Sequence, residues 1–284
     1  MKGFYDVVFI TTFVDKAHIG TLISSISTSN NTLRVLVVVA CQNGYDIPEQ
    51  TSEYVDVRRI KIPNIVSLSK ARNICLCYLK EHNLNYNYIM FPDDDSVFDE
   101  SFFRNFTTYV KGNTLIAVKA TQDRQTYFIK MPNKQFASQG DFHKAISVNM
   151  VIKGNIMNLV GGFDEQLGVG NYYGAGEDND FFIRCNKIEN FTFTNSIWNY
   201  HPLQYGQIKG STSQLKKRYN SYGRGVVYML MKHRMFRQAM FVIIRGYVGC
   251  IISIIKLNFK MAYVYCCASN ERLKTFIKSL YRLC

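Results

Sequence analysis

The sequence predicts an α/β fold with a mostly parallel central sheet, followed by a helical and strongly basic C-terminal region. Over residues 5–91, short β-branched runs alternate with helical patterns, as they do in right-handed βαβ units. From about residue 213 the chain is helical, basic and apolar to its end. The formal net charge of +13 lies entirely in this last part.

The expected elements of the first half are buried strands separated by helices. Strands are expected at residues 5–12, 33–39, 55–62 and 88–91, and helices at 17–27 and 69–82. The last of these strands runs straight into a proline and three aspartates. Since ligands of parallel sheets bind beyond the carboxyl ends of the strands, the acidic cluster falls where a ligand is expected.

The pattern changes after residue 111. Strands are expected at 114–119, 126–130 and 145–153, with polar loops rather than helices between them, and a helix is expected from about Glu177. We therefore divide the chain into residues 1–212, with halves 1–111 and 112–212, and a basic amphipathic tail at 213–284.

Composition bounds the class of protein. The 284 residues are 47% hydrophobic, which is enough for one large domain or two small ones. The eight cysteines form no C-x-x-C pair and lie in apolar stretches, which indicates reduced thiols. The N-terminus opens directly into a strand pattern without a signal peptide, so we expect a cytoplasmic protein.

The charge of the tail predicts a polyanionic partner. Residues 209–284 hold 15 Lys and Arg and a single acid, Glu271. The rest of the chain is almost neutral, so we expect an anionic membrane surface at 213–284 rather than nucleic acid. Residues 239–255 are apolar apart from Arg245, which favours helices lying in the interface of the plasma membrane's inner face. A buried helix of the fold and a single span are the alternatives.

The first chemical constellation is the acidic run Asp93-Asp94-Asp95, which follows a buried strand. Three adjacent carboxylates repel one another unless a cation or solvent relieves them. Oxygen ligands in this arrangement suit Mg²⁺ or Mn²⁺, which would in turn hold a diphosphate. The alternative is a solvated acidic turn that starts the next helix.

The second constellation is the segment GVGNYYGAGEDNDFFIR at residues 168–184. Its glycines allow the backbone to approach a ligand closely, and Tyr172 and Tyr173 offer rings that stack on a sugar face. Glu177 and Asp178 start a helix, where the dipole favours ionised carboxylates and a general base is expected. An ordinary helix start with acidic residues is the alternative.

Two further side chains are candidates with structural alternatives. His201 follows the only tryptophan, and a lone histidine is more often structural than a ligand. Arg72 lies near the beginning of a helix, where it would meet a phosphate or nucleotide. A solvated helix face is the alternative for Arg72.

The order of these motifs resembles the family 2 glycosyltransferases, over about residues 5–235. The resemblance rests on the segments SLSKARN, PDDD, GGFDE and GEDNDFFIR. It implies the GT-A fold, a Rossmann-like sheet with an appended acceptor-binding half. The stretch GAGEDND is also similar to the acceptor-side motif of β-1,4-galactosyltransferases.

The resemblance implies roles for the acids and the histidine. Asp93 and Asp94 would contact the nucleotide-sugar donor, and Asp95 would bind the Mn²⁺ or Mg²⁺ that bridges the diphosphate, completed by His201. Asp178 would be the catalytic base, in a single in-line displacement that inverts the anomeric configuration. Glu177 would orient the acceptor or donor sugar.

The remaining implied roles concern the two substrates. The acceptor site would be formed by Gly161, Gly162, Tyr172 and Tyr173. The donor site would be completed by Thr11, Thr12, Gln42, Asn43 and Arg72. Relatives carry an Asp after the second strand that contacts the base; the residues here are Gln42 and Asn43, so the base stays open, with a UDP-sugar favoured.

The setting implied by analogy is capsule or O-antigen assembly on a glycan or polyprenyl-linked glycan acceptor. Two alternatives remain. A sugar nucleotidyltransferase would carry a Gly-rich phosphate loop after the first strand, where this chain has only Gly20. A non-catalytic basic protein that binds membranes or nucleic acid would leave the acidic motifs without a purpose.

Overall fold

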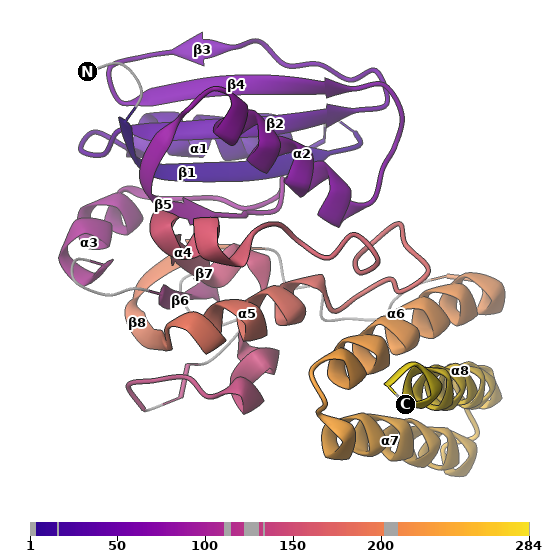
Figure 1. Cartoon of the computed structure of the whole chain (residues 1–284). Coiled ribbons are helices and arrows are strands. Elements are labelled where there is room, and N and C mark those ends of the chain that lie inside the picture. The colour runs from indigo at the N-terminus through magenta and orange to yellow at the C-terminus, as the bar shows by residue number, and fades with distance from the viewer. Residues whose placement is uncertain are drawn as a thin grey trace. The chain divides into compact units, whose positions relative to one another are not determined.

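In the computed structural model, one eight-stranded sheet crosses the first part of the chain (Figure 1). Residues 4–15, 17–110, 115–121, 131–132, 134–201 and 210–283 are described. The strand order is β3-β4-β2-β1-β5-β7-β6-β8. The strands are β1 (Phe4–Phe13), β2 (Val35–Gln42), β3 (Gln50–Thr51), β4 (Val55–Ile62), β5 (Asn85–Met90), β6 (Leu115–Thr121), β7 (Met150–Lys153) and β8 (Phe191–Tyr200).

Eight α-helices lie within the described residues. They are α1 (Ile19–Ser29), α2 (Leu68–Glu81), α3 (Glu100–Val110), α4 (Gly154–Val160), α5 (Glu177–Ile188), α6 (Thr212–Lys232), α7 (Phe236–Ile255) and α8 (Phe259–Leu283). Helices α1 and α2 cover opposite faces of the sheet (Figure 1). The mixed α/β class, the mostly parallel sheet and the helical C-terminal region confirm the predicted fold class.

The parallel half of the sheet is β4-β2-β1-β5, in which β1 pairs with β2 and β5, and β2 pairs with β4. All eight residues of β2 are buried, because helices cover both faces of the sheet and a strand buried on both faces reads as a continuous apolar run. Alternate β2 residues such as Val35 and Val37 join the core cluster that also contains Leu22 and Ile26 of α1.

Phenylalanines dominate the core between α3 and the sheet. The rings of Phe98 and Phe102 lie 4.7 Å apart at their centroids and meet edge to face. Phe9 of β1 lies 4.9 Å from Phe98, and Phe106 lies 5.6 Å from Phe102. Such arrangements add to the free energy gained by burying the rings. This cluster anchors the loop that leads from β5 to α3.

The sheet becomes mixed beyond β5, and here the structure differs from the expectation. Only the last four residues of the expected strand 145–153 form β7, which runs antiparallel to β5 and β6. Residues 147–149 form a 3₁₀ turn, because the Asn149 side chain accepts from Ile146 N and donates to Lys144 O. The expected strand 126–130 lies outside the described residues, and α4 and β8 were not expected.

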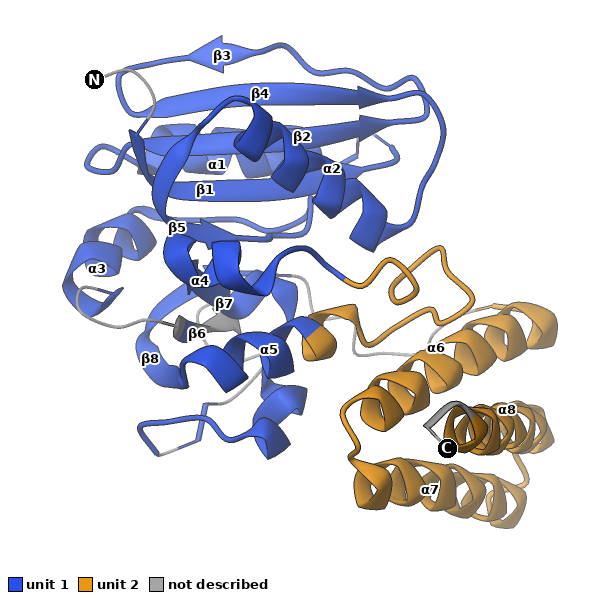
Figure 2. Ribbon diagram, viewed as in Figure 1, with its two compact units in different colours: residues 1–163, 181–204 blue, residues 164–180, 205–284 orange. Residues whose placement is uncertain are grey.

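The chain forms two compact units that do not follow the chain order (Figure 2). One contains residues 1–163 and 181–204, with the whole sheet; the other contains 164–180 and 205–284. The segment 164–180 therefore belongs with α6, α7 and α8 and not with the sheet. The predicted boundary at 212 treats that segment as part of the first domain, since a sequence gives no sign of contacts so distant along the chain.

Replacing Phe102 by Ala should lower the free energy of unfolding of the first unit by about 3–5 kcal/mol, because a buried ring is removed and its neighbours cannot fill the space. Urea unfolding followed by the fluorescence of Trp198, the only tryptophan, reports on this unit. Phe136→Ala is the matched control, since its ring is 52% exposed, and it should leave the midpoint almost unchanged. Equal effects of the two changes would contradict the assigned core.

Candidate functional site

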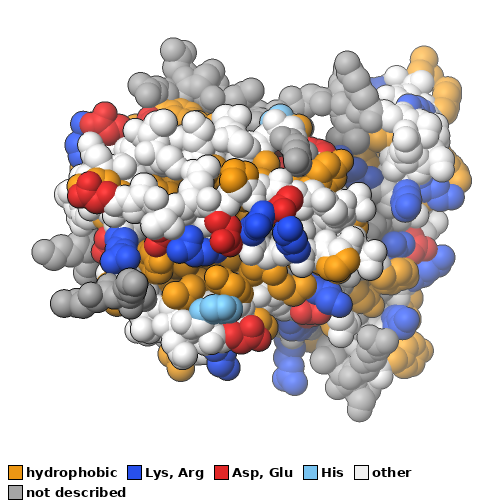
Figure 3. Space-filling view, turned by 90° about the horizontal axis from the view of Figure 1, so that it is seen from above, with side chains coloured by type: hydrophobic (Ala, Val, Ile, Leu, Met, Phe, Trp, Pro, Cys, Tyr) orange, Lys and Arg blue, Asp and Glu red, His pale blue; other side chains and the backbone are white. Residues whose placement is uncertain are grey.

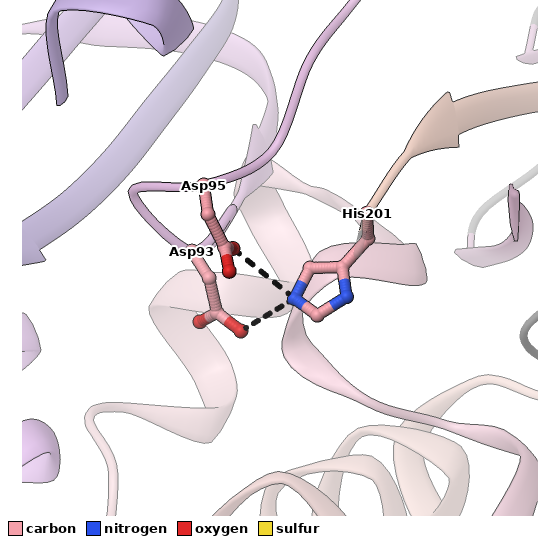
Figure 4. A group of neighbouring side chains, drawn as sticks. All are labelled: Asp93, Asp95 and His201. Carbon is pink, nitrogen blue, oxygen red and sulfur yellow. Dashed lines mark hydrogen bonds and ion pairs between the residues drawn. The ribbon is translucent and has the colours of Figure 1, made fainter. Parts of the chain in front are cut away.

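Two aspartates and a histidine converge where β5 and β8 end. Asp93 and Asp95 lie in the loop after β5, and His201 directly follows the last residue of β8. Backbone hydrogen bonds in both directions between Val97 and Tyr200, each 2.8 Å, hold this loop against the strand end. His201 Nε2 lies 3.2 Å from Asp93 Oδ2 and 3.3 Å from Asp95 Oδ1 (Figure 4).

The three side chains fit a hard divalent cation. One ligand atom from each lies within 4.8 Å of the others. Two carboxylate oxygens and an imidazole nitrogen are a donor set that suits Mn²⁺ or Mg²⁺. Asp95 Oδ1 is buried and has no hydrogen-bond partner among the described residues, and a cation would satisfy it. Coordination of a cation would require the neutral imidazole and ionised carboxylates.

In the acidic run, the pKa values of Asp93 and Asp94 are shifted in opposite directions. Desolvation raises the pKa of the Asp93 carboxyl, but the hydrogen bond with His201 and the charges of Arg72 and His201 outweigh it, so that pKa lies below its ordinary value. Burial, followed by the charges of Asp95 and Asp93, raises the pKa of Asp94 to about 6. The run thus resists carrying three negative charges, which is the electrostatic condition that a bound cation relieves.

Arg72 lies in the core and not on a solvated helix face. Its side chain is only 2% exposed, and Nη2 donates to Ser147 Oγ at 2.8 Å. Nη2 also lies 3.4 Å from Asp93 Oδ1, and the guanidinium lies over the ring of Phe163, 5.1 Å from its centroid. Helix α2, capped at its start by Ser67, positions this cation. A contact with the nucleotide stays a prediction; the observed role is to hold Asp93.

The residues that we expect to contact the nucleotide lie at the neighbouring ends of β1 and β2. Gln42 donates from Nε2 to Thr12 Oγ1 at 2.8 Å, and its Oε1 accepts from Val66 N at 2.8 Å. Gln42 therefore ties both strand ends to the loop before α2. Thr11 Oγ1 is buried with no hydrogen-bond partner in the described part of the chain. Asn43 turns the chain with a φ of 56°.

The segment Gly161-Gly162 is held by a residue that had no assigned role. The Asn73 side chain donates to Phe163 O at 2.9 Å and accepts from Phe163 N at 2.7 Å. A Cβ on Gly162 would lie 2.5 Å from Asn73 Oδ1, and Gly161 has a φ of 74°, so both glycines are required. The sequence signal for this role was that Asn73 directly follows Arg72. One turn of α2 therefore contacts both the loop after β5 and the segment Gly161-Gly162.

In the second unit, the two tyrosines are not equivalent. Tyr173 is 9% exposed and its ring stacks on Tyr228 at 4.1 Å between centroids. Tyr172 is 62% exposed, and the guanidinium of Arg224 lies 4.0 Å from its ring centroid. Tyr172 is therefore the ring that a ligand could reach, whereas Tyr173 fixes the segment.

The acidic residues at the start of α5 lie in different environments. Glu177 is 8% exposed and Asp178 is half-buried. Asp180 is fully buried, and its Oδ1 lies 2.8 Å from both Lys232 Nζ and His233 Nε2 of the α6 end. Burial lowers the pKa of Lys232, but its bonds with Asp164 and Asp180 outweigh this and raise that pKa overall. Sequence reasoning missed this cluster because Lys232 and His233 come 52 and 53 residues after Asp180.

Helix α6 packs against the segment 164–180 by backbone contact. A Cβ on Gly225 would lie 2.6 Å from Ala175 N, with Ala175 O nearer still. Ser221 O accepts from Gly174 N at 3.1 Å, and Arg224 Nε donates to Tyr172 O at 3.1 Å. Arg224 also pairs with Glu271 of α8 at 3.0 Å. The segment 164–180 is thus built onto the C-terminal helices.

Comparisons with known proteins identify the fold. No family model matches the chain, and no curated protein matches it. Among solved structures, S. aureus TarS 1-349 in complex with UDP-GlcNAc is 11% identical, with a TM-score of 0.56, over 99% of this chain and 92% of that one. The mannosyltransferase PcManGT from Pyrobaculum calidifontis, in complex with GDP-Man and Mn²⁺, is 10% identical. Its TM-score is 0.56 over 95% of this chain and 87% of that one. The chain shares their fold.

Removing a proposed metal ligand should abolish binding of Mn²⁺. Loss of a residue that only supports a ligand weakens metal binding by roughly 10–100-fold, so Asp95→Ala and His201→Ala should each exceed that range. Asp46→Ala removes a carboxylate paired with Arg59 and Lys61, outside the cluster, and should bind as the wild type does. Titration calorimetry with Mn²⁺ measures all three. Unchanged affinity in both ligand variants would refute the site.

Gly225→Ala should displace the segment 164–180, because the new Cβ meets the Ala175 backbone, which cannot rotate away. Gly249→Ala is the matched control in α7: its Cβ would meet Tyr265 at 3.7 Å, an ordinary contact. Alanine is the better helix former by about 1 kcal/mol, so the control should keep or raise the thermal midpoint. Limited proteolysis should cut within 164–180 only in Gly225→Ala. Equal resistance of the two variants would refute the backbone packing.

Proposed function

We propose that the chain is a metal-dependent glycosyltransferase of the family 2 type, which transfers a sugar from a nucleotide-sugar to an acceptor hydroxyl with inversion. The observation that carries the proposal is the Asp93–Asp95–His201 cluster at the carboxyl edge of the sheet. A fold shared with structures that hold UDP-GlcNAc, or GDP-Man and Mn²⁺, supports it. A divalent cation is the expected cofactor.

The residues divide the work of one in-line displacement. When bound, Mn²⁺ or Mg²⁺ would neutralise the diphosphate and stabilise the charge on the leaving group. Asp93 and Asp95 would supply carboxylate ligands to the cation. Arg72 keeps Asp93 ionised and oriented. Asp178 accepts the proton of the acceptor hydroxyl while its oxygen attacks the anomeric carbon. Glu177 orients the acceptor or donor sugar.

The donor proposed is a nucleotide-sugar, with UDP favoured. Its base would contact residues at the ends of β1 and β2, namely Thr11, Thr12, Gln42 and Asn43. The buried Thr11 hydroxyl supports this, because it lacks a hydrogen-bond partner among the described residues and a pyrimidine carbonyl or N–H would supply one. Gln42 keeps one amide N–H beyond its bond with Thr12.

The acceptor proposed is a glycan or polyprenyl-linked glycan, in cell-surface polysaccharide assembly such as capsule or O-antigen. An anionic membrane at the cytoplasmic face of the plasma membrane is the proposed partner of residues 213–284. The charge of this region supports that proposal, since 209–284 contain 15 cations and one acid. The exposed ring of Tyr172 supports a sugar acceptor.

The test is a panel of nucleotide-sugars incubated with the protein, Mn²⁺ and candidate glycan acceptors, with released nucleoside diphosphate as readout. One donor should be consumed, and EDTA should stop the reaction. Asp178→Asn should keep donor affinity and lose about 10²–10⁴-fold in transfer rate, which is what general base catalysis contributes.

Glu165→Gln removes an exposed acid of the same unit and should transfer at the wild-type rate. Undiminished transfer by Asp178→Asn would reassign the base. If no donor were consumed and nucleoside diphosphates with Mn²⁺ left the thermal midpoint unchanged, the glycosyltransferase assignment would be wrong.

A further inference from the structure

Helix α7 buries mostly small side chains and exposes most of its large apolar side chains. Its buried positions are Ala239, Ile243, Gly246 and Ser253, of which only Ile243 is large. The outer positions form a row at spacings of three and four residues, hereafter the α7 outer stripe: Phe241, Ile244, Val248, Ile251 and Ile255, which are 46–75% exposed. A surface helix of a soluble protein shows the opposite arrangement, so this stripe needs a partner that is apolar.

Length and composition alone would allow α7 to cross a membrane. It has 20 residues and a mean hydropathy of 1.9 over its most apolar window, of which only 22% is buried. The packing within its own unit opposes a span. The middle of α7, at Gly246, lies against Ser269 and Arg272 of α8, and Glu271 beside them pairs with Arg224 of α6. A spanning α7 would carry these charges into the hydrocarbon region.

The charges around the stripe select an anionic partner. Exposed cations flank α7 along and beyond its length: Arg234, Arg237, Arg245, Lys256 and Lys260. The region holds a single acid, Glu271, which is already paired. Two copies of this surface would repel each other, so self-association is disfavoured. The rest of the chain is nearly neutral, with acidic and basic side chains interspersed on the face seen in Figure 3.

We propose that the α7 outer stripe lies in the boundary between headgroups and acyl chains of an anionic bilayer, with the helix axis parallel to the membrane. The stripe supplies apolar contact, and the flanking cations meet lipid phosphates. Helices α6 and α8 remain above the acyl chains. This placement satisfies both the exposed apolar row and the charges of α8.

The same unit contains residues 164–180, the segment that we propose binds the acceptor. Docking of α7 would therefore also position this segment. Arg224, Gly225 and Tyr228 of α6 hold Tyr172 and Tyr173, so docking fixes the height of residues 164–180 above the bilayer. A segment held at a membrane serves an acceptor that is itself anchored there. The acceptor is therefore a glycan on a lipid carrier, a step that rests on the proposed function.

The docking itself is tested by flotation of the full chain with vesicles, without any donor or acceptor. Vesicles of phosphatidylcholine alone are compared with vesicles that also contain phosphatidylglycerol. The wild type should float with the anionic vesicles and dissociate as salt rises. A double variant, Ile244→Ser with Ile251→Ser, should lose about tenfold or more in vesicle affinity. Circular dichroism confirms that it is folded.

The matched control is Ile65→Ser with Leu159→Ser, two aliphatic residues of the first unit that are 61% and 70% exposed. It should float as the wild type does. Three results would overturn the docking: equal flotation of the stripe variant, a lipid-free dimer that only the stripe variant loses, or wild-type protein that alkaline carbonate cannot extract. A stripe variant that no longer floats yet transfers to a lipid-linked glycan in anionic vesicles at the wild-type rate would leave the activity standing and remove only the link between docking and a lipid-linked acceptor.

Discussion

A buried guanidinium connects the parts of this site. Arg72 is almost wholly removed from solvent, and taking a cation out of water costs several kcal/mol unless it is paired and hydrogen-bonded. Here Asp93 supplies the pair, Ser147 supplies a hydrogen bond, and the ring of Phe163 supplies a π face. The loop after β5, the 3₁₀ turn before β7 and the segment Gly161-Gly162 therefore meet on one turn of α2. That convergence explains why the acidic run has one fixed geometry although its charges repel.

The parallel half of the sheet was predictable because its signals are local. The run at 33–39 is apolar without alternation, which is what burial on both faces requires, and the strand expected at 55–62 is β4 itself. The expected strand at 145–153 was mostly wrong, because the Asn149 side chain competes for backbone hydrogen bonds, and hydrophobicity carries no sign of that.

The residue types of the site were predictable from the sequence, but the contacts between them were not. Three aspartates after a strand indicate a ligand edge, and the structure brings Asp93 and Asp95 to His201, 106 residues beyond Asp95 in the chain. The pairing of Arg72 with Asp93 and the close approach of Gly225 to Ala175 depend on tertiary packing. No sequence pattern distinguishes such an arginine from one on a solvated helix face, or such a glycine from one in a turn.

The carboxyl groups at the start of α5 differ in burial, and this difference limits what each of them can do. Asp180 has no exposure and lies against Lys232 and His233, so its carboxylate is committed to holding the α6 end. A carboxylate that is fully buried in this way has no access to a substrate. Glu177 is nearly buried, whereas Asp178 keeps part of its surface in solvent, the access that a base needs to reach an acceptor hydroxyl. This difference in burial supports the proposal that Asp178 is the base, which the motif also favours.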